Sequence, residues 1–167
     1  MLAFALAACG AREGAPSATI LAAAVADEPA PTLTANLRVA FSPVMLEALE
    51  RGIPLRLAFA LQRSGGGASL AARPALTLSY APLAQQYLLV DDSGAARSFA
   101  RRTQLLAALD RVRVPLPPAF AGAPAGARYA LRVRLDDAAL PGPLRLPALV
   151  SRDWRLATDE HVWRAPG

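Results

Sequence analysis

Hydrophobic and polar residues alternate along four segments of the chain, 32–41, 55–62, 76–80 and 128–136. Successive side chains of a β-strand point to opposite faces, so this alternation predicts strands with one buried face and one wet face. In the last segment, the buried face would carry Tyr129, Leu131, Val133 and Leu135. Strands of parallel sheets are usually buried on both faces and consist of continuous apolar runs. The alternation therefore predicts antiparallel sheets.

Two segments depart from this period and predict short helices. Ser42 followed by Pro43 is a typical start signal, and Gly52 is a typical stop, which predicts a helix over 43–51. A second helix is predicted over 99–112, where apolar residues recur at helical spacing: Leu105, Leu106, Leu109 and Val112.

These elements predict a mainly β protein, an antiparallel β-sandwich of immunoglobulin-like general architecture whose two short helices cover an opening of a sheet. The stretch 114–127, rich in Pro, Ala and Gly, is predicted to be a loop. A chain of 167 residues has the length of one domain, which we place over 18–167. Because Cys9 is the only cysteine, no disulfide can form within the chain.

Cys9 ends a short apolar run and resembles the acylated cysteine in the lipobox of bacterial lipoproteins, here written Leu-Ala-Ala-Cys at 6–9. We therefore interpret 1–8 as the remnant of an export signal, 9–17 as a polar tether and Cys9 as a lipidation site. This predicts a membrane-anchored domain in the periplasm or cell envelope. No basic residue precedes Cys9, although export signals normally begin with one, so a stray thiol in a truncated signal is the alternative.

The net charge of +5 at first suggests a nucleic-acid partner. All eighteen basic residues are Arg, however, and only Arg101 and Arg102 are adjacent in sequence. This scatter provides no continuous stripe that could follow a phosphate backbone. We predict no nucleic-acid binding.

Few residues could support catalysis or bind a metal. His161, the only histidine, follows Ser151 and Asp153, but no nucleophile elbow or oxyanion loop accompanies them. The acidic pairs at 91–92 and 136–137 could bind a hard cation, but they lie where strands end and are better explained by turn formation. We therefore predict no enzymatic activity, no cofactor and no metal site.

The C-terminal residues Arg152, Asp153, Trp154 and Trp163 are the candidate functional residues of the folded domain. They could form a structural clasp, in which Asp153 accepts a hydrogen bond from Arg152 or a backbone amide while Trp154 enters the core. They could instead anchor an interface, since Trp and Arg are enriched in binding hot spots. We favour the clasp, with Trp163 holding the last strand in place.

Several short motifs carry a family resemblance. In chain order they are Gly-Ile-Pro-Leu at 52–55, Leu-Ser-Tyr at 78–80, Gln-Tyr at 86–87, Phe99, Arg-Val-Arg-Leu-Asp at 132–136, Leu-Pro at 140–141, Ser-Arg-Asp-Trp at 151–154 and Trp163. The series spans 19–163 and resembles a proteobacterial family known as domain of unknown function 4390. The resemblance implies an exported single-domain protein, often encoded beside a membrane sensor kinase of the nitrogen-regulation type, with an accessory role in the periplasm.

The expected function is that of a non-enzymatic envelope domain that binds a protein partner, such as a sensor kinase, through a sheet face or a sheet edge. The alternative is a small-ligand or lipid-binding sandwich. That alternative needs a cavity between the sheets, lined by Leu55, Phe59, Leu78, Tyr80 and Val133.

Overall fold

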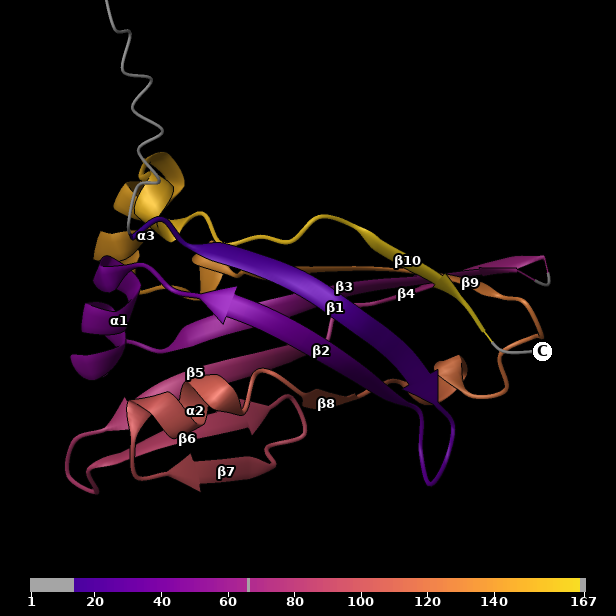
Figure 1. Cartoon of the computed structure of the whole chain (residues 1–167), viewed down its shortest axis with the longest axis horizontal. Helices are drawn as coiled ribbons and strands as arrows, with labels where there is room; N and C mark the ends of the chain where they lie inside the picture. Colours follow the sequence, from indigo (N-terminus) through magenta and orange to yellow (C-terminus); the bar gives the residue numbers. More distant parts are fainter. Residues whose placement is uncertain (1–13, 66, 166–167) are drawn as a thin grey trace, which may run out of the picture.

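Two antiparallel sheets pack face to face in the computed structural model, which describes residues 14–65 and 67–165 (Figure 1). The smaller sheet has the strand order β1-β2-β8. Its strands are β1 (Ser17–Ala26), β2 (Thr32–Ala40) and β8 (Val112–Pro115). Strand β2 is central, so β1 and β8 are the edges of this sheet.

The larger sheet has seven strands in the order β10-β9-β3-β5-β6-β7, with β4 also paired to β3. Its strands are β3 (Leu55–Gly65), β4 (Ala68–Ala72), β5 (Ala75–Ala81), β6 (Gln86–Asp91), β7 (Ala96–Phe99), β9 (Arg128–Leu135) and β10 (His161–Arg164). Each named pairing is antiparallel, which confirms the predicted mainly β sandwich.

The core lies between the two sheets and follows the alternation in the sequence. In β3, the four residues of the predicted inner face are fully buried: Leu55, Leu57, Phe59 and Leu61. They meet Leu33 and Leu37 from β2, which are also buried. Burial of apolar surface at roughly 25 cal/mol per Å² is the main force that holds the sheets together.

The first predicted helix is confirmed as α1 (Pro43–Glu50). The Ser42 hydroxyl caps it by accepting a 3.2 Å hydrogen bond from the Met45 amide, and Pro43 occupies the first turn. Gly52 follows with a φ of +83°, a backbone conformation that glycine adopts without steric cost. The helix therefore begins at the residue that the start signal predicts and ends one residue before the predicted end.

The second predicted helix is much shorter than 99–112. Helix α2 covers Arg102–Ala107, after which the chain turns and Val112 enters β8. The spacing of Leu105, Leu109 and Val112 misled the prediction, because a short helix, a turn and a strand bury the same three residues. The predicted loop at 114–127 is also wrong in part, since β8 extends to Pro115 and a 3₁₀ turn covers Pro118–Phe120.

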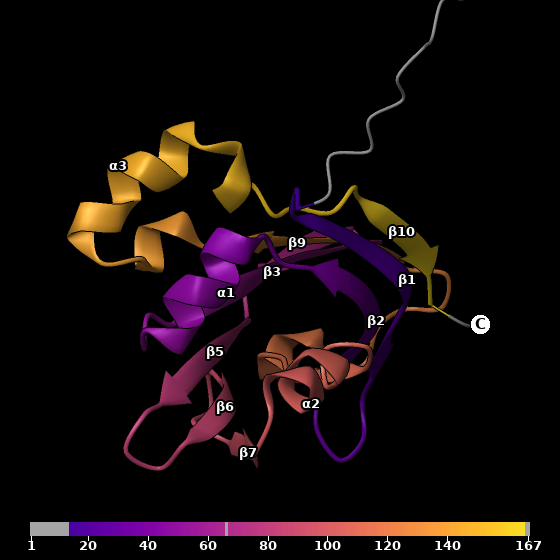
Figure 2. The same ribbon diagram turned by 60° about the vertical axis from the view of Figure 1, so that its left-hand side comes forward.

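A third helix, α3 (Gly142–Val150), is present among the described residues, although the sequence predicted only two. Its prolines, including Pro147 inside the helix, argue against a helix on sequence grounds. Helix α3 projects from the body beside α1 (Figure 2). Its exposed residues include Leu146, Leu149 and Val150.

Candidate functional site

The C-terminal motif at 151–154 forms a capped 3₁₀ turn, η3 (Arg152–Trp154). The Ser151 hydroxyl accepts a 3.2 Å hydrogen bond from the Asp153 amide, which closes the turn. Trp154 is only 6% exposed and packs in the core, as the clasp hypothesis requires. Arg152 and Asp153 are both exposed, so the motif divides between a buried and a solvated part.

The clasp differs from the predicted one in its polar atoms. Among the described residues, no ion pair joins Arg152 to Asp153, and the Asp153 carboxylate accepts only a 3.3 Å hydrogen bond from the Ser151 hydroxyl. The long-range bond uses the Asp153 main chain: its carbonyl oxygen accepts a 2.7 Å hydrogen bond from the hydroxyl of Ser42. In the sequence, Ser42 is recognisable only as a helix cap, because its neighbours in sequence do not indicate a partner 111 positions away.

Trp163 lies in β10 and stacks on Tyr129 of β9, with ring centroids 5.1 Å apart and an interplanar angle of 11°. The two residues are cross-strand partners, and Tyr129 is buried. Stacked aromatic pairs contribute about 0.5–1.5 kcal/mol beyond their buried area. This geometry supports the prediction that Trp163 holds the last strand in place.

His161 lies at the start of the same strand, with its ring centroid 5.7 Å from that of Trp163. In the described part of the chain, the Ser151 hydroxyl donates to Asp153, and no hydrogen bond connects His161 to either residue. The three residues thus do not form a linked triad in this structure.

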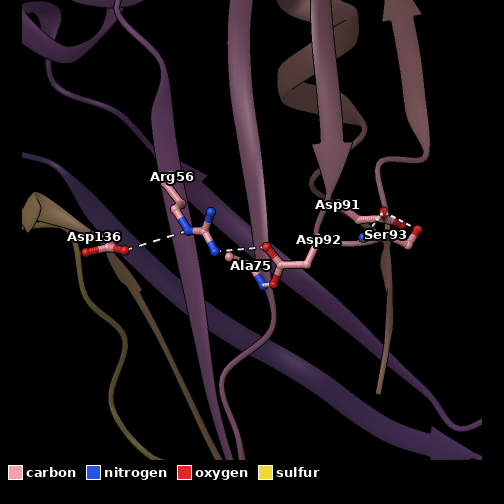
Figure 3. Close-up of polar contacts among 6 residues, drawn as sticks. All are labelled: Arg56, Ala75, Asp91, Asp92, Ser93 and Asp136. Atoms are coloured by element: carbon pink, nitrogen blue, oxygen red, sulfur yellow. Dashed lines mark hydrogen bonds and ion pairs between the residues drawn. The ribbon is translucent and has the colours of Figure 1, made fainter. Parts of the chain in front are cut away.

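Asp92 and Asp136, one residue from each acidic pair, interact with the same arginine of the large sheet (Figure 3). Arg56 of β3 donates a 2.8 Å hydrogen bond to the Asp92 carboxylate and pairs with Asp136 at 3.7 Å. Asp92 also accepts a 2.7 Å hydrogen bond from the Ala75 amide. Asp137 begins a short 3₁₀ turn, Asp137–Ala139. Among the described residues, no group of three potential metal ligands occurs.

Asp91 points away from this network and organises the turn after β6 (Figure 3). Its Oδ1 atom accepts hydrogen bonds from the amide of Ser93 at 2.9 Å, from the hydroxyl of Ser93 and from the amide of Ala95 at 3.0 Å. The turn predicted at this acidic pair is therefore confirmed, and its hydrogen bonds to the aspartate side chain make it an Asx-type turn.

The feature that sequence analysis missed is the long edge strand β1. Within residues 14–65 and 67–165 it pairs with β2 on one side only, and the sequence of Ser17–Ala26 contains no charged residue and no proline. Natural sheets usually protect such edges with charges, prolines or very short strands. The run of alanines in β1 hid it, because alanine gives almost no contrast between inner and outer faces.

The second half of β1 faces β10 across a groove of about 390 Å³. Both strands are edges of their sheets, and they lie side by side in Figures 1 and 2 without pairing. Residues lining the groove include Ala23, Val25, Asp27, Tyr129, Trp163 and Arg164. The Tyr129–Trp163 stack gives it a flat aromatic wall.

The five residues predicted to line a ligand cavity lie elsewhere. Leu55, Phe59, Leu78 and Val133 are buried in the core cluster, and Tyr80 is half-buried beside Tyr87. None of the five lines the groove between β1 and β10.

The predicted lipidation site Cys9 and the export-signal remnant at 1–8 lie outside the described residues, as does most of the predicted tether at 9–17. The tether was predicted to end at Ser17, which is already the first residue of β1. None of the helices described here is long and apolar enough to cross a membrane.

These observations define the chain as a two-sheet antiparallel β protein with an open strand edge beside an aromatic groove. Its sequence matches the family model of a domain of unknown function (DUF4390) over residues 21–164, and the chain belongs to this family. No curated protein and no solved structure gives a significant match.

Proposed function

We propose that this protein is a non-enzymatic domain of a proteobacterial cell envelope that binds an extended segment of a partner protein along strand β1. The observation that carries the proposal is the edge of β1 beside the groove, which carries no charged residue and pairs with no strand among the described residues. An edge strand presents a row of unpaired amide and carbonyl groups, which is the chemistry that recognises another strand.

The groove supplies what an open backbone edge lacks, which is selectivity for side chains. Alternate side chains of an added strand point to the same face. The side chains of Ala23 and Val25 leave room there, and Trp163 offers an aromatic surface. We therefore expect the bound segment to place an aromatic or long aliphatic side chain into the groove, since such anchors dominate binding energies.

The short stretch between Cys9 and the folded domain limits how far β1 could lie from a membrane to which Cys9 is anchored. A Cβ atom built on Gly14 would lie 3.6 Å from the Pro43 ring, so the chain enters the domain beside α1. Gly14 is five positions after Cys9 in the sequence, and an extended chain covers at most roughly 18 Å over five steps. An acyl group on Cys9 therefore keeps β1 close to the membrane, within reach of a membrane protein such as a sensor kinase.

Site-specific photocrosslinking tests the proposed edge. A photoreactive residue at Ala23 should capture one membrane protein in cells, whereas the same residue at the fully exposed Leu83 should not. Equal capture from both positions would contradict the proposal. Deuterium exchange of the complex with the captured partner should show new protection of β1 amides, and protection only elsewhere would also contradict it.

A matched pair of substitutions tests the groove separately. Ala23 lines it, whereas the neighbouring Ala22 is exposed and lies outside its lining. Ala23→Lys should weaken crosslinking at a second groove position, Val25, about tenfold or more, and Ala22→Lys should leave it within twofold. Equal effects of both variants would contradict a role for the groove.

Fractionation tests the tether independently of the edge. The Cys9→Ser variant should move from the membrane to the soluble fraction. Unchanged membrane association would contradict lipidation and would leave the evidence for the β1 edge intact.

A further inference from the structure

A second hollow, of about 270 Å³, opens on the other side of the sandwich, where β6 and β7 approach β8. Two buried leucines, Leu76 and Leu89, form its apolar floor. Three exposed arginines, Arg97, Arg111 and Arg113, line the rest together with Asp91 and Ala95. The hollow therefore combines an apolar floor with three guanidinium groups at its rim, which suits a ligand that has both an apolar and an anionic part.

Strand register explains how one of these arginines reaches the hollow. Arg97 of β7 is the cross-strand partner of Leu89, which in turn pairs with Leu78. Cross-strand partners share a face of the sheet, so Arg97 continues a row of buried leucines at the point where the sheet ends. It stands where an apolar residue would extend the core.

The other two arginines come from the opposite sheet. Arg111 and Arg113 flank the buried Val112 at the start of β8, an edge strand of the smaller sheet. The hollow therefore draws its positive charge from the edges of both sheets, which meet at this side of the sandwich.

The positive charge around the hollow is only partly balanced by the protein. Within the described residues, no ion pair or side-chain hydrogen bond involves Arg97, Arg111 or Arg113. Of the described residues, Asp91 alone brings a carboxylate to the lining; it offsets one of the three positive charges, and its Oδ1 atom accepts hydrogen bonds from the turn at Ser93 and Ala95 (Figure 3). Arg97 does lie over the Phe99 ring, 5.8 Å from its centroid, and this contact leaves its charge uncompensated.

We propose that this hollow binds a small amphiphilic anion, with a phosphate head group among the three arginines and a short apolar part on Leu76 and Leu89. Guanidinium groups form paired, charge-assisted hydrogen bonds with phosphate oxygens. A hollow of 270 Å³ is near the lower end of the usual range of ligand sites, which suits a head group and the first part of a chain rather than a whole lipid.

Calorimetric titration of the full chain with three probes tests the proposal. Octyl phosphate, kept below its micelle concentration, should bind at least tenfold more tightly than inorganic phosphate or octyl glucoside at the same ionic strength. Equal binding of inorganic phosphate would overturn the apolar part of the proposal. Equal binding of octyl glucoside would overturn the anionic part.

Charge-neutralising variants locate the site. Arg97→Gln, Arg111→Gln and Arg113→Gln should each weaken octyl phosphate binding about tenfold, the change expected when a charge-assisted hydrogen bond is lost. Arg128→Gln is the matched control, because Arg128 is also exposed but lies in β9, toward the opposite edge of the large sheet. An equal loss in Arg128→Gln would assign the binding to net charge and overturn the site. Thermal melts of all four variants confirm folding.

A competition experiment distinguishes the two sources of such a phosphate. Displacement of octyl phosphate by vesicles of phosphatidic acid would support a lipid head group as the ligand. Retention of octyl phosphate in the presence of these vesicles would support a soluble phosphomonoester.

Discussion

The hydroxyl group of Ser42 donates a 2.7 Å hydrogen bond to the carbonyl oxygen of Asp153, which lies 111 residues further along the chain. The same oxygen of Ser42 accepts a hydrogen bond from the amide of Met45 in the first turn of α1. Ser42 is fully buried. One hydroxyl therefore both caps α1 and fixes the C-terminal turn η3 against it.

Replacing Ser42 by Ala should destabilise the protein by about 1–3 kcal/mol. The substitution leaves the buried amide of Met45 and the part-buried carbonyl of Asp153 without their partner, and an unsatisfied buried polar group costs about that much. Loss of the helix cap acts in the same direction. Denaturant-induced unfolding followed by circular dichroism measures the change.

Asp153→Asn is the control for this prediction. It keeps the main-chain carbonyl and changes only an exposed carboxylate, so the free energy of unfolding should change by about 0.5 kcal/mol or less. A loss as large as that of Ser42→Ala would show that the carboxylate, not the carbonyl, forms the clasp. Unchanged stability together with lost partner capture would show that Asp153 belongs to an interface.

Much of the sheet architecture could be predicted because inner and outer residues of its strands differ sharply in polarity. In β9, the arginines Arg132 and Arg134 alternate with Leu131 and Val133. The strand can bury the two apolar residues only by turning the face that carries them toward the core. The helix signals at Ser42 and Gly52 are equally local. Strand alternation and helix signals depend on residues that are close together in the sequence, so they can be recognised without the structure.

The candidate sites could not be predicted, because each depends on residues that meet only after folding. Strand β1 consists largely of alanine and carries little periodic signal, and its open edge follows from the strand order of the sheet. The hollow beside β8 brings together Arg97 and Arg113, which look like scattered surface charges in the sequence. Helix α3 contains Pro147, a residue that disfavours a helix on local grounds.

Leu131→Ala should destabilise the protein by roughly 2–5 kcal/mol. Leu131 is fully buried in β9, and removal of a buried leucine side chain costs the lost transfer energy and leaves a cavity. Arg132→Ala tests the opposite face of the same strand. Arg132 is exposed and pairs with Glu160 at 3.6 Å, so its removal should cost about 1 kcal/mol or less. Chemical denaturation of both variants measures the contrast, and equal losses would contradict the assigned faces of β9.

Asp92→Ala should destabilise the protein more than Asp136→Ala. The Asp92 carboxylate accepts hydrogen bonds from both Arg56 and the Ala75 amide, whereas the Asp136 carboxylate has, among the described residues, only an ion pair with Arg56 at 3.7 Å. We expect a loss of about 1–2 kcal/mol for Asp92→Ala. For Asp136→Ala, we expect about 0.5 kcal/mol, decreasing as salt is added. Thermal unfolding at low and high salt tests both values, and a larger loss for Asp136→Ala would contradict the network.

Tyr87 provides a pH-dependent test of the packing around β6. Its ring lies 4.7 Å from that of its cross-strand partner Tyr80, measured between centroids. Glu50 lies nearby and forms an ion pair with Arg102. Partial burial, followed by the negative charge of Glu50, raises the pKa of the Tyr87 phenol above its ordinary value of 10.0.

The folded protein therefore favours the neutral phenol, and this contribution to stability should be complete below pH 10 and lost as the pH rises through the raised pKa. Above pH 10 the unfolded chain releases the Tyr87 proton first, so the free energy of unfolding falls with increasing pH. The chain contains no lysine, and its arginines stay protonated in this range, which leaves tyrosines as the main titrating side chains of the folded domain. Denaturant unfolding from pH 9 to 11.5 should show a shallower fall for Tyr87→Phe than for the unchanged protein. Identical slopes would contradict the raised pKa, because Tyr87→Phe keeps the ring and removes only the ionisable group.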